Sequence, residues 1–366
     1  MDPTPATPLL ISRSSVIKYV VITGANRPSM GFNTAKKLSD MGYHVVLGCR
    51  REELGKAAQK EIRNSTYVHL DLASLISVKS FKERAEMLVP QLKEIGVSIL
   101  INNAGKGWGT RTTEKEMTID GHESFYQVNH LGHFLLTALL MPLLVIAGTS
   151  DVPARVVIVS SSLHDPSSRG NKSRKNEESS TIPEFLNAHH LKLRQKSSLG
   201  AGGGGKDNID DEKEKEKEIN VKFNAKEAYC RSKLCNILHT YELEKKIRAM
   251  HLPVVCSCLS PGFVPATGLI RDSGCIGKFF LRCCLDGVMK LCCSVTRTVE
   301  DAAMCQVLVA TSREASTGGH YFEYTRAKQL RIQASSKESF DEGKQKKLWN
   351  LSCEQVGISN DWLAEL

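Results

Sequence analysis

The sequence predicts an α/β fold in which one parallel sheet is flanked by helices. Short β-branched runs alternate with longer amphipathic runs through most of the 366 residues, a pattern typical of βα units. Glycine or polar residues follow the ends of several apolar runs, and 41% of the chain is hydrophobic, which is enough for a large core. Because right-handed crossovers join such strands, their carboxyl ends should meet at one edge, where ligands gather.

The composition excludes several other classes of protein. No apolar run reaches the ~20 residues of a membrane-spanning helix, and residues 1–18 lack the apolar stretch of a secretory signal. The 12 cysteines without regular spacing indicate reduced thiols in a cytosolic compartment. The formal charge of +9 favours anionic cofactors or membrane surfaces. No nucleic-acid-binding motif or zinc-ligand spacing accompanies it, so we expect no nucleic-acid partner and no metal.

The first βα unit carries a glycine-bearing turn. Tyr19–Thr23 is predicted to be a strand, Gly24 to Gly31 a turn, and residues 33–41 a helix. This arrangement directs helix N-terminal amides at a pyrophosphate, although an ordinary βα turn is the alternative.

The second strand, predicted at 44–50, ends in two arginines. Arginine at this place suits a ribose 2′-phosphate, whereas an acidic residue suits a free 2′-hydroxyl. No acid precedes Arg50 and Arg51, and Arg27 in the glycine turn adds a second phosphate partner. We therefore expect NADPH rather than NADH. The alternative is that these arginines are solvated residues at a helix start.

Three more strands are predicted at 67–72, 99–102 and 155–162, with helices over about 76–94 and 129–144. Asp71, the pair Asn102 and Asn103, and Ser161 or Ser162 fall at the strand ends. Asn129 is a polar residue within an apolar helix, so it is either satisfied locally or functional.

Residues 165–222 differ in composition from the rest of the chain. Serine patches, a glycine run at 202–205 and alternating Glu and Lys at 211–218 give low hydrophobicity and mixed charge. Such a segment buries too little apolar surface to offset its ordering entropy. We expect a largely disordered insertion that divides the domain into 19–164 and 223–358, with an extension at 1–18 and a tail at 359–366.

Tyr229 and Lys233 stand four residues apart in a run, 225–250, that is predicted to be a helix. Residues at this spacing share one helical face. A nearby ammonium favours the phenolate and lowers a tyrosine pKa from about 10. Tyr229 is therefore a candidate general acid or base for an alcohol oxygen. The alternative is a half-buried tyrosine beside a surface lysine.

The remaining segments are a strand at 254–259 that ends at Pro261 and Gly262, helices at 298–311 and 342–356, and a strand at 320–324. Residues 275–293 form an amphipathic pattern with a wide apolar face. They are expected to be a lid helix on the core or a peripheral contact with the cytosolic face of a membrane.

Together these motifs resemble the short-chain dehydrogenase/reductase family. The resemblance rests on Thr23-Gly24-Ala25-Asn26 with Gly31, Asn102-Asn103-Ala104-Gly105, the run from Asn129, Val159-Ser160-Ser161, Tyr229 with Lys233, and Pro261-Gly262. Within the family, the sequence is similar to retinol dehydrogenases and protochlorophyllide reductases.

The resemblance implies a Rossmann-type doubly wound sheet of about seven strands and the following roles. Tyr229 would be the general acid/base, Lys233 would lower its pKa and hold the nicotinamide ribose, Ser161 would bind the carbonyl oxygen, and Asn129 would complete a water-linked proton path. The cofactor NADP(H) would contact Gly24, Asn26, Arg27, Gly31, Arg50, Asp71, Leu72, Asn102, Asn103, Ala104, Gly105, Pro261, Gly262 and Thr267, together with Tyr229 and Lys233.

Three departures from the family pattern qualify this expectation. The glycine turn is one residue longer, and Ser29 stands near the usual middle glycine, where a Cβ would crowd a pyrophosphate. The insertion separates Ser161 from Tyr229, and Ser162 rivals Ser161. The expected activity is reduction or oxidation of an apolar carbonyl or alcohol that is retinoid-, steroid- or lipid-like. Protochlorophyllide-type ring reduction and a non-catalytic dinucleotide-binding scaffold are the alternatives, and the family commonly forms homodimers.

Overall fold

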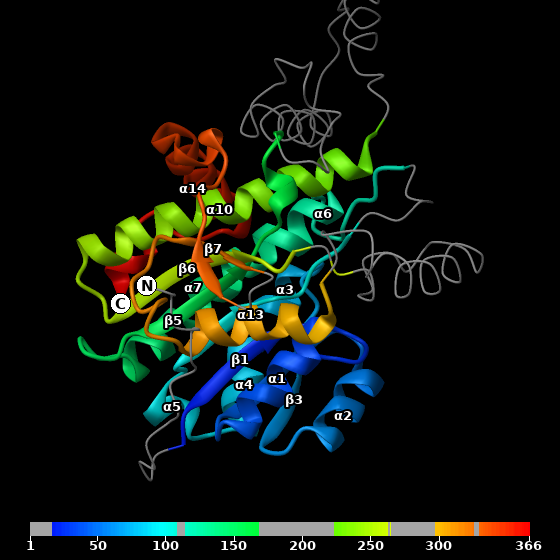
Figure 1. The fold of residues 1–366 in the computed structure, drawn as a ribbon, viewed down its shortest axis with the longest axis vertical. Helices are drawn as coiled ribbons and strands as arrows, with labels where there is room; N and C mark the ends of the chain where they lie inside the picture. Colours follow the sequence, from blue (N-terminus) through cyan, green and yellow to red (C-terminus); the bar gives the residue numbers. More distant parts are fainter. Residues whose placement is uncertain (1–16, 108–113, 168–222, 263, 265–296, 326–328) are drawn as a thin grey trace, which may run out of the picture.

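The protein is built on one eight-stranded sheet in the order β3-β2-β1-β4-β5-β6-β7-β8 (Figure 1). The computed structural model describes residues 17–107, 114–167, 223–262, 264, 297–325 and 329–366. The strands are β1 (Tyr19–Thr23), β2 (His44–Cys49), β3 (Ser65–His69), β4 (Ile99–Asn102), β5 (Ala154–Val159), β6 (Val254–Ser260), β7 (Tyr321–Tyr324) and β8 (Leu330–Ile332). All neighbours pair in parallel except β7 and β8. The predicted fold class is confirmed, and the additional strand, β8, has only 3 residues, too few for a recognisable alternating pattern.

The helices are α1 (Met30–Asp40), α2 (Glu52–Glu61), α3 (Leu75–Lys79), α4 (Phe81–Leu88), α5 (Leu92–Ile95), α6 (Ser124–Tyr126), the π-helical turn η1 (Gln127–Leu131), α7 (Gly132–Ala147), α10 (Ala225–Ala249), α13 (Val299–Thr311) and α14 (Glu342–Val356), with 3-10 turns η2 (Ser162–His164), η5 (Lys337–Phe340) and η6 (Trp362–Glu365). The single helix predicted over 76–94 is wrong. It is three short helices. The chain leaves helical geometry at Ser80 and again at Val89, where the following Pro90 has no amide hydrogen to continue the ladder.

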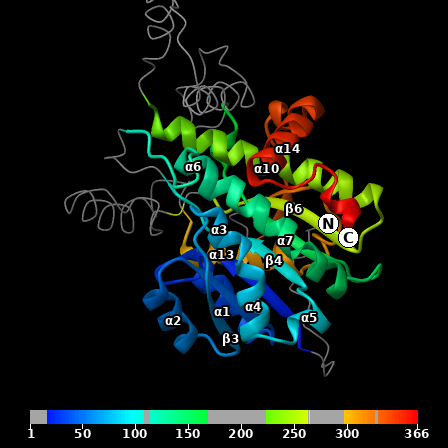
Figure 2. The same ribbon diagram turned by 180° about the vertical axis from the view of Figure 1, so that it is seen from behind.

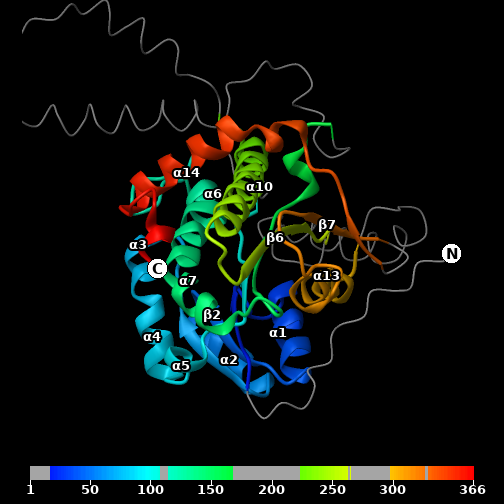
Figure 3. The same ribbon diagram turned by 90° about the vertical axis from the view of Figure 1, so that its left-hand side faces the viewer.

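Two helical layers cover the sheet. Helices α1 and α13 pack with α2 on one face, and α4, α5, α7, α10 and α14 pack on the other (Figures 2 and 3). In β1, Val20 and Ile22 face the first layer, while Tyr19 and Val21 face the second. Every residue of β1 is therefore buried, as expected for a central parallel strand.

The chain reverses its direction across the sheet between β1 and β4. It first runs outward from β1 to β3 and then returns to place β4 on the other side of β1. The loops that follow β1 and β4 consequently leave in opposite directions at their carboxyl ends, and we call this switch point the crevice. Ligands of doubly wound sheets bind at such a point.

One stretch among the described residues, Ser124–Ala147, is long and apolar enough to cross a membrane by length and composition. Of its most apolar window, 67% is buried inside the fold. The segment packs against α3, α4 and α5 on one side and β4 and β5 on the other. Its apolar composition is therefore explained by its place in the core of the fold.

Candidate active site

The turn after β1 is fixed by the hydroxyl of Thr23. Thr23 Oγ1 accepts hydrogen bonds from the amides of Asn103, at 2.9 Å, and Ala104, at 2.8 Å. The next residue, Gly24, has φ +70°, and a Cβ there would lie 3.0 Å from the Cβ of Ala104. Glycine adopts this left-handed conformation without strain. The ends of β1 and β4 are thus joined at the crevice.

The turn then enters α1 through Ser29. Ser29 Oγ accepts from the amide of Phe32 at 3.0 Å and donates to the carbonyl of Gly24 at 3.1 Å, so it caps the helix. A Cβ on Gly31 would lie 2.4 Å from Asn103 Nδ2, which explains the glycine. The first turn of α1 contains no acidic residue. A positive helix end and a compact turn fit a pyrophosphate, and the hydroxyl of Ser29 is directed to its own turn.

The two predicted phosphate partners, Arg27 and Arg50, follow β1 and β2. Arg27 pairs with Glu61 at 2.7 Å and lies over the ring of Phe32, yet its side chain is 61% exposed. Asn26 Nδ2 donates to the carbonyl of Arg27 at 3.3 Å. Arg50, directly after the strand, is exposed. Both side chains are accessible to an anionic group. An anion that binds Arg27 would have to replace Glu61 or share Arg27 with it.

Beyond β3, Asp71 organises its own loop. Its Oδ1 accepts from the amide of Ala73 at 3.0 Å, and its amide donates to Ser77 Oγ at 3.0 Å. Leu72 is 5% exposed and packs against α7, where a Cβ on Gly132 would lie 2.8 Å from the Leu72 carbonyl oxygen. The loop is therefore rigidly attached to the core beside the crevice.

The paired asparagines at the end of β4 hold neighbouring elements together. Asn102 is 1% exposed and its Nδ2 donates to Thr137 Oγ1 on α7 at 2.9 Å, while its Oδ1 is buried without a hydrogen-bond partner. Asn103 Nδ2 donates to the Thr23 carbonyl at 2.6 Å, and its Oδ1 accepts from Gln306 on α13 at 2.8 Å. The contact of Asn102 with a ribose stays a prediction.

Helix α10 brings Tyr229 and Lys233 to the end of β5. Lys233 Nζ donates to the Val159 carbonyl at 3.0 Å, and its own carbonyl accepts from Ser160 Oγ at 2.8 Å. Nζ also lies 5.7 Å from the centre of the Tyr229 ring. The two side chains share one helical face, as their spacing predicts.

The electrostatics of this pair differ from the sequence expectation. Burial raises the pKa of Tyr229, and a hydrogen bond with Ser161 opposes that shift only in part. Burial also lowers the pKa of Lys233 to about 8. The expectation of a lowered tyrosine pKa is therefore wrong, because desolvation by burial is the largest cause of the shift. Tyr229 is a neutral phenol here.

Ser161 contacts Tyr229 through its side chain, and Ser162 contacts Ser260 through its backbone amide. The hydroxyl of Ser161 is hydrogen-bonded to the phenol. The amide of Ser162 donates to Ser260 Oγ at 3.1 Å, which joins the ends of β5 and β6. Ser161 is accordingly the serine that the structure brings to Tyr229.

Asn129 lies in the π-helical turn η1 and supports the loop after β4. Its Oδ1 accepts from the amide of Lys106 at 2.7 Å, and its Nδ2 donates to the Lys106 carbonyl at 3.0 Å and to Ser232 Oγ at 2.8 Å. A Cβ on Gly105 would lie 3.3 Å from Asn129 Oδ1 and 3.6 Å from Lys233 Nζ. Asn129 and Lys233 thus converge on Gly105. The water link between them stays a prediction.

At the end of β6, Pro261 is half-buried and Gly262 is exposed with φ +77°. The amide of Gly262 donates to Ser260 Oγ at 3.4 Å. Thr267 and the amphipathic segment 275–293 lie outside the described residues, as does most of the insertion.

Sequence reasoning assigned no role to several residues that organise the crevice: Thr23, His133, His164, Ser260 and Gln306. His164 Nδ1 donates to the Ser161 carbonyl at 2.7 Å, and its Nε2 accepts from the amide of Ser336 at 3.0 Å. For His133, the available signal was a polar residue within an apolar run, four residues after the candidate Asn129.

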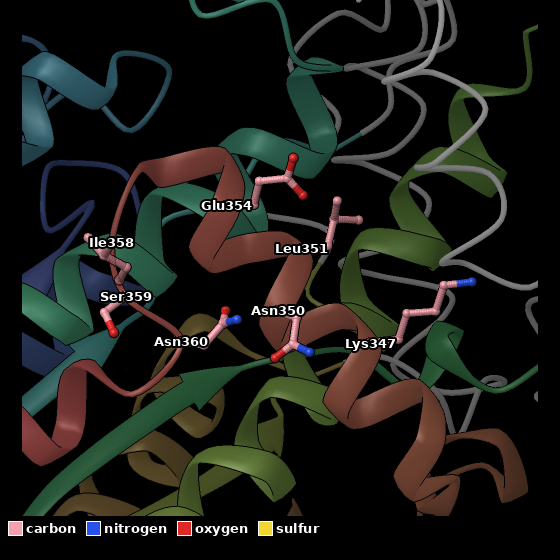
Figure 4. A pocket seen from close by; sticks show the side chains of 7 residues that line it. All are labelled: Lys347, Asn350, Leu351, Glu354, Ile358, Ser359 and Asn360. Atoms are coloured by element: carbon pink, nitrogen blue, oxygen red, sulfur yellow. The ribbon is translucent and has the colours of Figure 1, made fainter.

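A pocket of about 580 Å³ lies elsewhere, between α14 and the loop that follows it (Figure 4). It is lined by polar and charged side chains with two aliphatic ones, namely Lys347, Asn350, Leu351, Glu354, Ile358, Ser359 and Asn360. None of these is a predicted site residue. Among the residues that the structure describes, no cluster of three or more potential metal ligands is present.

The fold and the site define a dinucleotide-binding α/β protein in which a tyrosine, a lysine and a serine meet beside the crevice. A family profile described as short chain dehydrogenase matches residues 18–170. Retinol dehydrogenase 13 of Homo sapiens is 32% identical over 93% of this chain and 85% of its own length. Protochlorophyllide reductase of Pisum sativum is 29% identical over 97% of this chain and 83% of its own length.

An uncharacterized protein from Mycobacterium Paratuberculosis has a similar structure, with a TM-score of 0.60, 25% identity, and coverage of 94% of this chain and 96% of its own. The chain belongs to the short-chain dehydrogenase family. It is therefore placed among the oxidoreductases that use NAD or NADP.

Proposed function

We propose that the protein is an NADPH-dependent oxidoreductase that transfers a hydride between the nicotinamide and an apolar carbonyl or alcohol of retinoid-, steroid- or lipid-like chemistry. The observation that carries the proposal is the hydrogen bond of Tyr229 with Ser161, beside the buried ammonium of Lys233. The similarity to a retinol dehydrogenase supports an apolar substrate.

The residues present fit a dinucleotide. The N-terminus of α1 and the turn from Gly24 to Gly31 would hold the pyrophosphate. Lys233 and the backbone of Gly105 would border the nicotinamide ribose. The bound cofactor supplies the hydride, and the protein orients it.

The protein's own groups manage the proton and the developing charge. Because burial keeps Tyr229 protonated, its hydroxyl can donate a proton to a carbonyl oxygen that becomes an alcohol. The hydroxyl of Ser161 would hydrogen-bond the same oxygen as negative charge develops. Lys233, as an ammonium below about pH 8, would stabilise the phenolate that remains.

The preference for NADPH rests on Arg27 and Arg50. Both are exposed, and Arg50 directly follows β2, where the adenosine ribose lies in this fold class. Changing Arg50→Ala should raise KM for NADPH about tenfold or more, since a hydrogen bond to a charged group contributes about 1.5–3 kcal/mol. KM for NADH should change little. Equal changes for both cofactors would contradict the assignment.

The test of the activity is a screen of NADPH oxidation over aldehydes and ketones of graded chain length, with wild type and Tyr229→Phe. Turnover that rises with chain length and vanishes in the variant supports the proposal. Full activity in the variant would refute it. The same screen with residues 170–220 deleted tests whether the insertion is needed.

A second candidate function is protochlorophyllide-type ring reduction, which the similarity to the Pisum sativum enzyme favours. This reaction needs pigment and light. Turnover of simple carbonyls in the dark would count against it. Failure to bind NADPH at millimolar concentration in calorimetry would instead indicate a scaffold.

Peripheral contact with the cytosolic face of a membrane through 275–293, a cytoplasmic location and a homodimer also belong to this proposal. Sedimentation with and without anionic vesicles would test membrane contact and self-association together.

A further inference from the structure

His133 connects the two halves of the candidate site. It lies in the first turn of α7, next to η1, and is 2% exposed. Its Nε2 is 2.9 Å from Thr23 Oγ1, at the start of the cofactor turn. Its Nδ1 is 3.2 Å from the carbonyl oxygen of Asn129, in the π-helical turn. One imidazole therefore spans from β1 to the element that faces Lys233.

The hydrogen-bond count at Thr23 determines the tautomer of His133. A threonine hydroxyl has one hydrogen and two lone pairs. Thr23 Oγ1 already accepts from the amides of Asn103 and Ala104. Its hydrogen must then be donated to His133 Nε2, which accepts. The ring hydrogen is consequently on Nδ1, where it can be donated to the Asn129 carbonyl.

We propose that His133 is a positioning residue, a neutral imidazole that holds the cofactor turn and the π-helical turn at a fixed separation. The proposal rests on the proposed function for its catalytic consequence. Through Thr23, the ring supports the loop that begins at Gly24. Through Asn129, it sets the position of Gly105 relative to Lys233. Neither link places His133 on the substrate or the cofactor.

The electrostatics agree with a neutral ring. Burial lowers the pKa of His133 to about 3, and the charge of Lys233 acts in the same direction. A protonated ring would direct a second N–H at a hydroxyl whose lone pairs are already used, so the arrangement tolerates only the neutral form.

Three substitutions separate the two links. His133→Gln places an amide near the position of Nε2 and can keep the bond with Thr23. His133→Asn places an amide near the position of Nδ1 and can keep the bond with Asn129. His133→Leu removes both. The matched control is His239→Leu, because His239 is also a buried histidine, 4% exposed, packed against Phe134 at a ring distance of 5.0 Å.

Loss of the hydrogen bond with Thr23, in His133→Asn, should raise the NADPH Kd about tenfold. Loss of the hydrogen bond with Asn129, in His133→Gln, should lower kcat at saturating NADPH about tenfold, and His133→Leu should show both effects. These sizes are those expected for one buried hydrogen bond. The His239→Leu control should lower Tm with Kd and kcat within about twofold of wild type. If the His133 variants lower Tm but leave Kd and kcat unchanged, the residue is merely structural and the proposal is overturned.

A second readout does not depend on turnover. The ¹⁵N shifts of the imidazole, assigned by their loss in His133→Gln, should show a neutral ring protonated on Nδ1 at pH 7. Protonation on Nε2, or an imidazolium, would overturn the proposal. If wild type reduced no carbonyl, the proposed function would fail, while the tautomer and the NADPH Kd would still test the role of His133.

Discussion

The two sides of the crevice are stabilised in different ways. On the side of β1 and β4, Thr23, Asn103 and Gln306 satisfy one another's polar groups, so this region resembles a folded core with a glycine turn attached. On the side of β5 and α10, Tyr229 and Lys233 are ionisable groups that burial has moved away from their ordinary pKa values. The first side is held by neutral hydrogen bonds, and the second carries the electrostatic cost of burying two ionisable groups.

The largest expected effect tests the chemical side. Tyr229→Phe removes the proton donor but keeps the ring, and general acid–base catalysis contributes about 10²–10⁴-fold. We expect kcat to fall by about that factor with the NADPH Kd and Tm nearly unchanged. Stopped-flow turnover and calorimetry measure the two effects. A parallel loss of NADPH binding would show that the phenol acts mainly in binding.

The next effect tests the structural side. Gly31→Ala places a Cβ 2.4 Å from Asn103 Nδ2 and 2.8 Å from the Gly24 carbonyl oxygen. Overpacking of this kind costs about 1–3 kcal/mol. We expect urea unfolding to show that loss together with weaker NADPH binding.

The control for that change is Gly42→Ala, where a Cβ would meet nothing within 4 Å although φ is +96°. It should destabilise through backbone strain and leave cofactor affinity unchanged. Equal losses of affinity in both variants would mean that crowding at Asn103 is not the cause.

The pH dependence sharpens the contrast further. In the free enzyme, Lys233 is an ammonium below about pH 8 and neutral above it, so kcat/KM should fall as pH rises through about 8. Because the folded-state pKa lies below the ordinary 10.5, the unfolded chain binds more protons between about pH 8 and 10.5. Stability from this group should therefore rise with pH in that window.

Two measurements from about pH 6 to 10 test these trends. Initial rates should show the fall in kcat/KM, and urea titrations should show the rise in stability; both follow from the lowered pKa of Lys233. The variant Lys233→Met should lose both dependences. Activity that stays constant through pH 9 in wild type would contradict the role of the ammonium.

The smallest effect concerns the helix cap. Ser29→Ala removes the hydroxyl that accepts from the amide of Phe32 and donates to Gly24. Loss of an N-cap costs about 1 kcal/mol. We expect a modest fall in Tm and an NADPH Kd within a few-fold of wild type. A large gain in affinity would show that the side chain crowds the pyrophosphate after all.

The strands were predictable because local pattern decides them, although the predicted strands 67–72 and 155–162 run three residues past the ends of β3 and β5, at His69 and Val159. Val20 to Ile22 and Val156 to Ile158 are apolar runs with turn residues after them, and their parallel pairing follows from chain order. The spacing of Tyr229 and Lys233 likewise predicted a shared face. The direction of the Tyr229 pKa shift was not predictable, since it depends on burial by residues distant in sequence.

The links through His133 and Gln306 were hidden for the same reason. Each joins elements that are far apart in the chain, and nothing in a local window shows which partner a buried polar side chain will meet. The break before Pro90, in contrast, can be read from the sequence, because proline has no amide hydrogen for the helical ladder.

The antiparallel strand β8 has a consequence for self-association. It occupies the pairing groups on the free side of β7, with Phe322 opposite Ile332 and Tyr324 opposite Leu330. A second copy therefore cannot add its own strand to β7 and continue the sheet. A strand of 3 residues offers little template beyond it. Two chains that associate at this end of the sheet would have to meet through helices or loops.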